Sequence, residues 1–295
     1  MEKFIISCCS TADLSAKHFD KRRIHYICSP FQLGGREYLD DLGESIYPEE
    51  LYRRMLAGEK VSTDPISPAV YADFFTEYLA EGKDILHVSL SSGLSKNYHN
   101  ACLARDRLTG RYPDRKIYII DSLCASSGYG LLVDTLADLR DTGMTIEELV
   151  RWAEEKKTRL HHWFFSSDLS FYIAGGRIPK ATGIAGTVMG ICPLLYVNRK
   201  GCLVSYENVH SKKNVIKKIV EQMERHAMNG LDYAGKCYLC HSVCMEDART
   251  VAALVEKTFV NLNGKVQIFP VGVCIGAHTG PGTIALFFFG NERTD

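Results

Sequence analysis

Short apolar runs alternate with helix-like stretches over the first half of the chain. The strand-like runs, each closed by a polar turn, span residues 4–7, 85–90 and 117–120. The helix-like stretches span residues 48–56, 67–80, 95–108 and 128–140. This alternation predicts a mostly parallel sheet with helices on both faces, and such sheets bind ligands beyond the carboxyl ends of their strands.

The pattern changes after a helix predicted over 145–159, which begins with a capping signal from Thr145 to Glu148. The elements predicted beyond it are strands at 162–166, 194–198 and 203–209 and helices at 214–228 and 246–258. Residues 268–290 predict strand, turn and strand, because prolines and several glycines interrupt an apolar stretch. The chain is therefore predicted to form two α/β domains, residues 1–160 and 161–295.

The composition is that of a globular protein with no strong electric field. Among 295 residues, 35 basic and 35 acidic side chains balance, and 46% are hydrophobic. These values exclude disorder and argue against a nucleic-acid or acidic membrane partner. The apolar run within Met1–Cys9 is too short for a signal peptide, and the broken stretch 268–290 is unlike a membrane helix. We therefore expect a cytoplasmic protein whose eleven cysteines are reduced.

Three turns at the ends of predicted strands carry hydroxyl groups. They are Ser62–Pro65, Ser89–Ser95 and Asp121–Ser122. Hydroxyls at a helix N-terminus, together with free backbone N–H groups, form a site for a carboxylate or a phosphate. Helix capping is the alternative for each turn taken alone. The expected meeting of all three turns at one sheet edge favours a binding site.

Two glycine-rich segments each hold a basic side chain. In Gly175–Pro179, which precedes a glycine-punctuated run at 183–190, Arg177 would either clamp an oxyanion or pair with a neighbouring carboxylate. In Gly276–Gly282, His278 is predicted in a turn that follows a strand. Its imidazole would donate to a carboxylate, act as a base, bind a metal or have a structural role only. No H-E-x-x-H pattern accompanies it to support a metal.

A cysteine cluster lies further along the chain, at Cys237, Cys240 and Cys244, with His241 inside it. The C-x-x-C spacing raises zinc, an iron–sulfur cluster or haem attachment as possibilities. A second cysteine pair is missing from the sequence. The segment is also typical of a buried strand, in which Cys237 and Cys240 would point to opposite faces. The predicted site therefore contains no metal.

Taken together, the motifs resemble the DegV family of bacterial fatty-acid-binding proteins. The matching segments, in order, are STADL (10–14), Ser62-Thr63-x-Pro65, LSSGLS (90–95), IIDS (119–122), DLSFYIAGGRI (168–178), ICPLL (191–195) and GAHTGPG (276–282). DLxxxxxGGRI and GxHxGPG together are specific, whereas the serine turns alone are not. The resemblance implies two α/β domains, the second with a mixed sheet, and a long-chain fatty acid as the bound ligand, with no other cofactor.

The resemblance also assigns roles to residues. Thr63 and Ser95 would bind the fatty-acid carboxylate, with Ser62 and Ser92 nearby and His278 as a further head-group contact. In the best understood members, a separate fatty acid kinase converts the presented carboxylate to an acyl phosphate for phospholipid synthesis. Arg177 and the position of His210 would face this kinase or the phosphate that it transfers.

Three departures from the family pattern accompany these matches. Cys9 stands where the family usually has an acid, Lys96 stands where it usually has a glycine, and His210 replaces an arginine. The last change removes a permanent charge that would serve phosphoryl transfer. The departures leave fatty acid binding intact as an expectation and put the coupling to a kinase in question.

Simple energetics agree with a buried acyl chain held by neutral donors. Burying about 15 methylenes at about 0.8 kcal/mol each contributes on the order of 12 kcal/mol before ordering costs. The carboxylate then needs only enough hydrogen bonds to avoid being buried unpaired. Hydroxyls and an imidazole supply them and leave an oxygen free for phosphorylation.

Two other functions are open on the sequence alone. A hydrolase or acyltransferase would use a serine such as Ser95 with His278 as base, although the chain lacks a G-x-S-x-G elbow. A metal or redox protein would use the cysteine cluster. The leading hypothesis is a binding protein, not an enzyme, whose bound acid is the substrate of a partner kinase.

Overall fold

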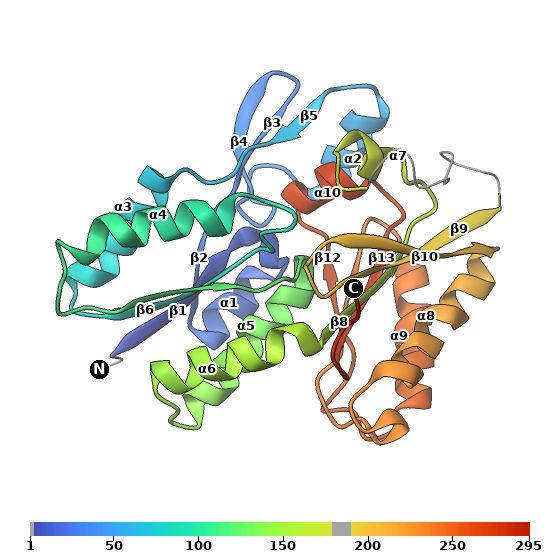
Figure 1. Cartoon of the computed structure of the whole chain (residues 1–295). Coiled ribbons are helices and arrows are strands. Elements are labelled where there is room, and N and C mark those ends of the chain that lie inside the picture. Colours follow the sequence, from blue (N-terminus) through green and yellow to red (C-terminus); the bar gives the residue numbers. More distant parts are fainter. Residues whose placement is uncertain (1–2, 179–189) are drawn as a thin grey trace.

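The first half of the chain forms a parallel sheet, as predicted. The computed structural model describes residues 3–178 and 190–295 (Figure 1); residues 179–189, which include most of the glycine run predicted to matter at 183–190, lie outside the described part. The four strands are β1 (Phe4–Cys9), β2 (Ile24–Ile27), β6 (Asp84–Ser89) and β7 (Ile117–Asp121). They pair in the order β2-β1-β6-β7, and every pairing is parallel.

Helices cover both faces of this sheet, which is why its strands are buried on both sides. The helices are α1 (Ala16–Arg22), α3 (Pro68–Ala80), α4 (Asn97–Thr109), α5 (Ser126–Asp141) and α6 (Ile146–Lys156). On one face, Ile5 and Ile85 pack with the apolar side chains of α3 and α4. On the other face, Ile6 and Leu86 pack with α5. Alternate residues of each strand thus belong to different cores.

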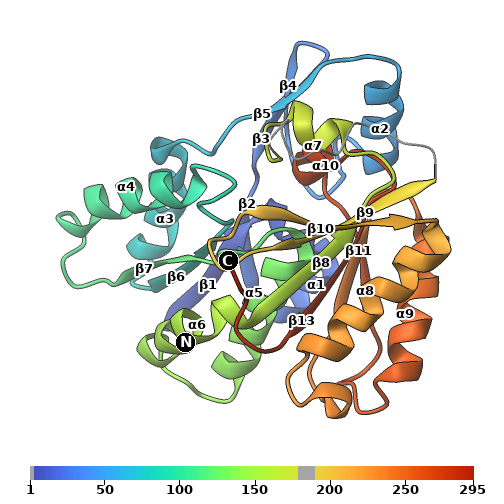
Figure 2. The same ribbon diagram turned by 45° about the vertical axis from the view of Figure 1, so that its right-hand side comes forward.

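The second half forms a mixed sheet of six strands, again as predicted. Its strands are β8 (Leu160–Phe165), β9 (Ile191–Val197), β10 (Leu203–His210), β11 (Tyr238–His241), β12 (Gln267–Pro270) and β13 (Ile284–Phe289). The order is β10-β9-β8-β13-β11-β12, and only β11 and β12 pair in parallel. Helices α8 (Lys212–His226) and α9 (Met245–Thr258) cover one face (Figure 2).

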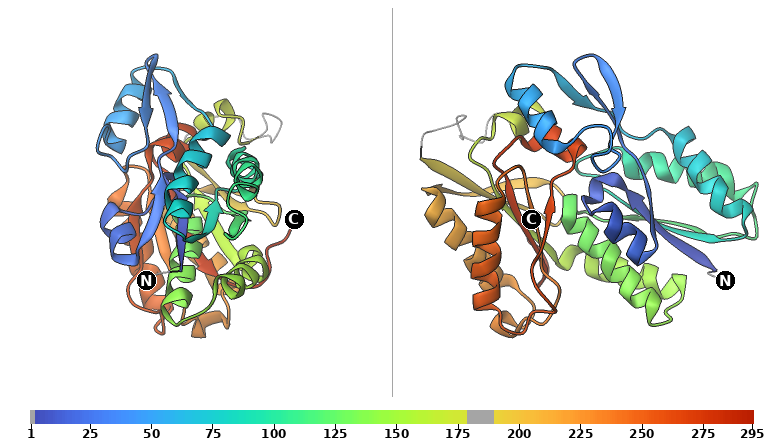
Figure 3. Two further views of the ribbon diagram at one scale, coloured as in Figure 1. Left: turned by 90° about the vertical axis from the view of Figure 1, so that its left-hand side faces the viewer. Right: turned by 180° about the vertical axis from the view of Figure 1, so that it is seen from behind.

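Helix α5 lies between the two sheets and packs on both (Figure 3). Its buried side chains Leu131, Leu132 and Leu136 join one apolar cluster that includes Leu86 of the parallel sheet and Phe287 of the mixed sheet. The predicted domain boundary near residue 160 therefore coincides with the start of β8 but does not separate two independent cores. The boundary itself stays a prediction.

A small antiparallel sheet sits above the other two and was not expected. It consists of β3 (Pro30–Leu33), β4 (Arg36–Leu39) and β5 (Val61–Thr63), in the order β4-β3-β5. The short helices beside it are α2 (Pro48–Leu56), α7 (Ser170–Ala174) and α10 (Val273–Thr279). Thr63 thus belongs to this sheet, and the prediction that its turn ends a strand of the parallel sheet is wrong.

Helix α10 also corrects the prediction of strand, turn and strand over 268–290. The two strands exist as β12 and β13, but residues 273–279 between them are helical. The apolar residues of this segment face two sides at once, because Val273 packs on the core under the small sheet while Ile275 packs on the core of α5. Among residues 3–178 and 190–295, no helix is long and apolar enough to cross a membrane.

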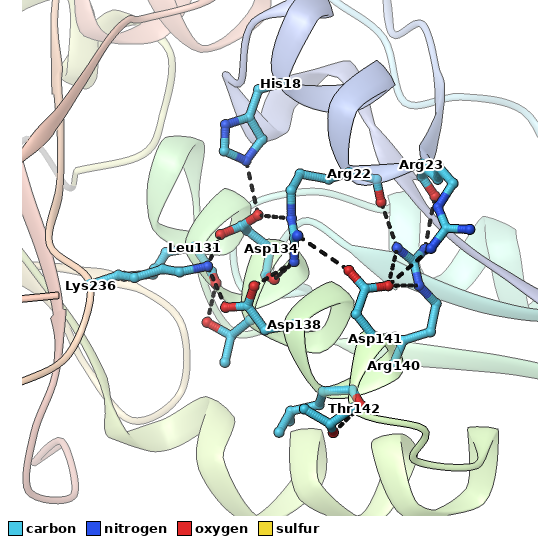
Figure 4. A network of polar contacts seen from close by, with 12 residues as sticks. His18, Arg22, Arg23, Leu131, Asp134, Asp138, Arg140, Asp141, Thr142 and Lys236 are labelled. Carbon is cyan, nitrogen blue, oxygen red and sulfur yellow. Dashed lines mark hydrogen bonds and ion pairs between the residues drawn. The ribbon is translucent and has the colours of Figure 1, made fainter. Parts of the chain in front are cut away.

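An ion-pair network joins α1, α5 and the segment before β11 (Figure 4). Asp134 is 1% exposed; it accepts hydrogen bonds from His18 Nε2 at 3.0 Å, Arg22 Nε at 2.8 Å and the Tyr238 hydroxyl at 2.7 Å. Lys236 donates to Asp134 and pairs with Asp138 as well. These partners hold the pKa of Asp134 well below its usual range although burial opposes that shift. The network ties α1 and α5 of the first half to Lys236 and Tyr238 of the second half.

Candidate ligand-binding site

A cavity of about 520 Å³ lies between the two large sheets and under α10. This volume is within the range of roughly 300 to 1,000 Å³ that is usual for small-molecule pockets. Residues that follow the carboxyl ends of β1, β6 and β7 line one side of it: Thr11, Leu90, Ser92 and Ala125. The cavity is therefore where a parallel sheet is expected to bind its ligand.

Most of the cavity wall is apolar. Its apolar side chains come from both halves of the chain and are Leu90, Leu94, Phe164, Val197, Leu203, Val271, Ile275, Ala285 and Phe287. Several of them belong to the cluster that α5 shares with both sheets. A hydrocarbon chain placed here would be removed from water, which stabilises binding by about 0.8 kcal/mol for each methylene.

Thr63 and His278 meet at one end of the cavity. The Thr63 Oγ1 atom lies 2.6 Å from His278 Nε2, although the two residues are 215 positions apart. Strand β5 presents Thr63 from one side, and α10 presents His278 from the other. The sequence predicted both residues at the head-group site, and the structure brings them together.

The imidazole of His278 is neutral at physiological pH. Burial, together with the nearby Arg177 guanidinium, lowers the pKa of His278 to about 4. Its Nδ1 atom is buried without a hydrogen-bond partner among the described residues. With the proton on Nε2, His278 donates to Thr63 and leaves the threonine hydroxyl free to donate to a bound oxyanion.

Ser92 and Ser95 also line the cavity, from the turn before α4. Ser95 Oγ accepts a hydrogen bond from the backbone N–H of Asn97 at 3.2 Å, although the N-cap residue of α4 is Lys96, whose side chain makes no capping bond. An accepting hydroxyl keeps its own hydrogen for donation. The backbone N–H of Ser92 is held by Asp121 Oδ1 at 3.0 Å, which fixes the turn against β7.

Arg177 also lies on the cavity wall. Its guanidinium donates to the carbonyl oxygens of Gly175 at 2.5 Å and Leu94 at 3.4 Å. No ion pair with a carboxylate is found for Arg177 in the described part of the chain, so the expected alternative of a carboxylate partner is not met there. The structure therefore puts a cation beside the Thr63–His278 pair.

Two other predicted residues do not line the cavity. Ser62 is exposed, because neighbouring residues of a strand point to opposite faces and Thr63 points inward. His210 is exposed at the end of β10, where its backbone carbonyl accepts a hydrogen bond from Asn214 at 2.8 Å. Lys96, one of the three departures from the family pattern, is exposed and does line the cavity mouth.

The arrangement does not favour the serine hydrolase. His278 bonds to Thr63, and no hydrogen bond joins it to Ser95 within residues 3–178 and 190–295. A nucleophilic serine needs a base within hydrogen-bond reach.

The cysteines are separated as predicted, because Cys237 packs in the core under α8 and α9 whereas Cys240 packs in the core of α5. The described residues contain no group of three or more metal-ligating side chains.

Sequence reasoning missed several polar residues of the cavity. They are Thr11, Ser29, Ser126, Tyr172, Cys274, Thr279 and Thr283. For α10 the signal was present, since Cys274, Ile275, His278 and Thr279 recur at the spacing of one helical face. That spacing was hidden by the interpretation of the segment as strand and turn.

Comparison with known proteins identifies the family. A model of the DegV family, described as uncharacterised proteins, matches residues 3–291. This chain belongs to the DegV family. A DegV domain-containing protein of Clostridium perfringens is 32% identical over 293 residues, which is 99% of each chain. A second such relative, from Lactococcus lactis, is 30% identical and 94% of each chain is covered.

Solved structures share the fold of this DegV protein. A DegV protein of Thermus thermophilus, described as binding fatty acid, has a TM-score of 0.87 and 22% identity, with 98% of this chain and 99% of that chain covered. The fatty acid kinase B3 protein of Streptococcus pneumoniae, loaded with linoleic acid, has a TM-score of 0.83 and 20% identity, with 99% and 100% covered. At these identities the likeness shows the fold.

Proposed function

We propose that this DegV protein binds a long-chain fatty acid and presents its carboxylate to a partner fatty acid kinase, which forms the acyl phosphate. The single observation that carries the first part is the Thr63–His278 pair on the wall of a largely apolar cavity. Fatty acids in two neighbours of the same fold support it. The B3 protein of Streptococcus pneumoniae supports the second part.

The carboxylate is held by neutral donors in this proposal. Thr63 and Ser95 donate their hydroxyl hydrogens, and His278 orients Thr63 by donating to it. Ser92 lines the cavity from the same turn, and its hydroxyl would add a further contact, because its backbone N–H is held by Asp121. Each hydrogen bond to a charged group contributes about 1.5 to 3 kcal/mol, so two or three are enough to offset the loss of water around the carboxylate.

Cations near the site suit the charged product better than the substrate. An acyl phosphate adds negative charge, and Arg177 and Lys96 both line the cavity at the end where it would form. A kinase surface that docks around this mouth would also meet His210 if it extended along β10. Arg177 is the residue that we assign to the phosphate, and His210 to the outer kinase-facing surface.

The binding step is tested on the full chain with a matched pair of variants on β5. Lipid extracted under denaturing conditions from the purified protein is identified by mass spectrometry, and affinity for palmitic acid is measured on delipidated protein. Thr63→Val is expected to weaken binding about 10- to 150-fold through the loss of one charge-assisted hydrogen bond. Ser62→Ala, one residue away on the opposite face, is expected to leave affinity unchanged. Absence of bound fatty acid and of palmitate binding in the wild type would refute the proposal.

The kinase step needs a separate assay. Loaded wild-type protein is mixed with a purified bacterial fatty acid kinase and ATP, and acyl phosphate is trapped with hydroxylamine. Arg177→Gln is expected to lower the yield of product while palmitate affinity changes less than in Thr63→Val. Palmitate binding without any acyl phosphate would remove the kinase role and leave the binding role standing.

A further inference from the structure

The cavity has a second polar patch on its wall, formed by hydroxyl groups without partners. Thr11 and Ser29 both line the cavity, and each is only 3% exposed. Neither Thr11 Oγ1 nor Ser29 Oγ has a hydrogen-bond partner among the described residues. The nearby phenol of Tyr129 gives its only hydrogen to the Cys9 carbonyl and accepts the Cys9 N–H, both at 2.8 Å, so it has no hydrogen to donate to Thr11. A buried hydroxyl left in this state costs free energy, which a ligand oxygen would recover.

The backbone around this patch is fixed by its own hydrogen bonds. The N–H of Ser29 donates to Ser10 Oγ at 3.1 Å, and the carbonyl of Ser29 accepts the N–H of Asp40 at 2.8 Å. The thiol of Cys274, on the first turn of α10, lies 3.7 Å from the same carbonyl. Three segments therefore meet here: the turn after β1, the connection before β3 and the start of α10. The side-chain hydroxyls of Thr11 and Ser29 are the groups that remain free to bind a ligand.

Two buried carboxyl groups lie near the start of α10, on the segments that carry the patch. Asp13 is 4% exposed and Asp40 is 1% exposed. A side-chain carbon added to Gly272 would lie 2.5 Å from Asp13 Oδ1 and 3.5 Å from Asp40 Oδ2, so both carboxyls approach the start of α10. Ser126, which lines the cavity, donates to Asp13. Carboxyl oxygens near the patch add hydrogen-bond acceptors to its two hydroxyls. The patch would therefore bind a neutral group that can both donate and accept a hydrogen bond.

Helix α10 sets the distance between this patch and the head-group end. Cys274 at the patch and His278 at the head-group end are four residues apart and both line the cavity. At a rise of 1.5 Å per residue this is about 6 Å along the helix. An acyl chain that begins at Thr63 and His278 would therefore pass the patch within the half of its length nearest the carboxylate.

From this geometry we propose that the cavity selects a hydroxylated long-chain acid, whose hydroxyl group binds between Thr11 and Ser29. The proposal rests on the proposed function and specifies the substrate class of the same cavity. A hydroxyl suits the patch better than a keto group, because it donates as well as accepts. It also suits the patch better than a second anionic group, which the carboxyls of Asp13 and Asp40 would repel in a buried site.

The test compares palmitic acid with a positional series of monohydroxylated palmitic acids on delipidated full-length protein. Calorimetry or fluorescence displacement gives the dissociation constant of each. We expect the acids hydroxylated in the carboxyl-proximal half to bind about 3- to 10-fold more tightly than palmitic acid, as one net hydrogen bond provides. The acid hydroxylated at the terminal carbon should bind more weakly than palmitic acid, because its hydroxyl would be buried among apolar side chains.

Variants separate this proposal from a general effect of polarity. Ser29→Ala and Thr11→Val should each bring the preference close to one, whereas Ser170→Ala, an exposed serine on α7 outside the cavity, should keep it. Equal affinity for palmitic acid and every hydroxylated acid in the wild type would overturn the proposal, since ordered water would then satisfy the patch. A preference that survives in both variants would overturn it as well. If no acid binds at all, the proposed function fails instead.

Discussion

Replacing Asp134 by asparagine tests whether the network between the two halves is a major source of stability. Asp134 is buried, and it accepts from Arg22, Lys236, His18 and Tyr238. Asparagine has nearly the same shape but no charge, so it leaves the cations of Arg22 and Lys236, whose side chains are 19% exposed, with one partner fewer. Breaking a buried ion pair from one side costs about 3 to 5 kcal/mol.

The neighbouring Asp138 supplies the matched control. It pairs with the same two cations, Arg22 and Lys236, but its side chain is 42% exposed (Figure 4). An exposed ion pair contributes about 0 to 1 kcal/mol. We therefore expect Asp134→Asn to lower the free energy of unfolding by about 3 kcal/mol or more and Asp138→Asn by less than about 1 kcal/mol.

Urea unfolding, followed by circular dichroism, measures both changes, and its pH dependence gives a second check. Because the pKa of Asp134 is lower in the folded protein than in the unfolded chain, its contribution is fully present above about pH 4 and is lost as the pH falls further. The difference between wild type and Asp134→Asn should therefore shrink below about pH 4. Equal losses in the two variants, or a loss under about 1 kcal/mol in Asp134→Asn, would show that burial does not strengthen this network.

Three further predictions concern single residues. Burial raises the pKa of Asp40 to about 6, so the charged carboxylate destabilises the folded protein above that pH. Asp40→Asn should therefore raise the free energy of unfolding by roughly 2 to 3 kcal/mol at about pH 8. This gain should vanish towards about pH 4, where Asp40 is protonated in the folded protein. Gly128→Ala should lower the free energy of unfolding by about 1 to 3 kcal/mol, because the new methyl would lie 2.2 Å from His162 Nε2. Gly110→Ala should be nearly neutral, because no atom lies within contact distance of the methyl that it adds. Lys96→Gly should weaken fatty acid binding a few-fold at low salt and hardly at all at high salt, as titrations at two ionic strengths would show; the same loss at both would contradict a screened charge.

Much of the fold is contained in the apolar pattern of the sequence. The strands of the parallel sheet and helices such as 67–80 and 145–159 were predicted because period and capping agree, and Thr145 does form a capping box with Glu148. The mixed second sheet was confirmed as well. The small sheet was missed because β3, β4 and β5 are only three or four residues long. Strands of that length carry too few residues to show a period.

The candidate site was predictable only as far as motifs could be matched. Thr63 and His278 meet as expected, although 215 positions separate them and no local pattern relates them. Ser62 was grouped with Thr63 because the motif contains both, yet the alternation of a strand sends it to the opposite face. Thr11 of the patch lies in the STADL segment, but no motif relates it to Ser29. The patch exists because the connection before β3 contacts both α10 and the turn after β1.

The position of α5 makes the two halves of the chain depend on each other. Its leucines are covered by the parallel sheet on one side and by the mixed sheet on the other. Two fragments made by dividing the chain near the start of β8 would each expose a large apolar surface to solvent. Neither half is therefore expected to stay folded and unaggregated when it is made alone.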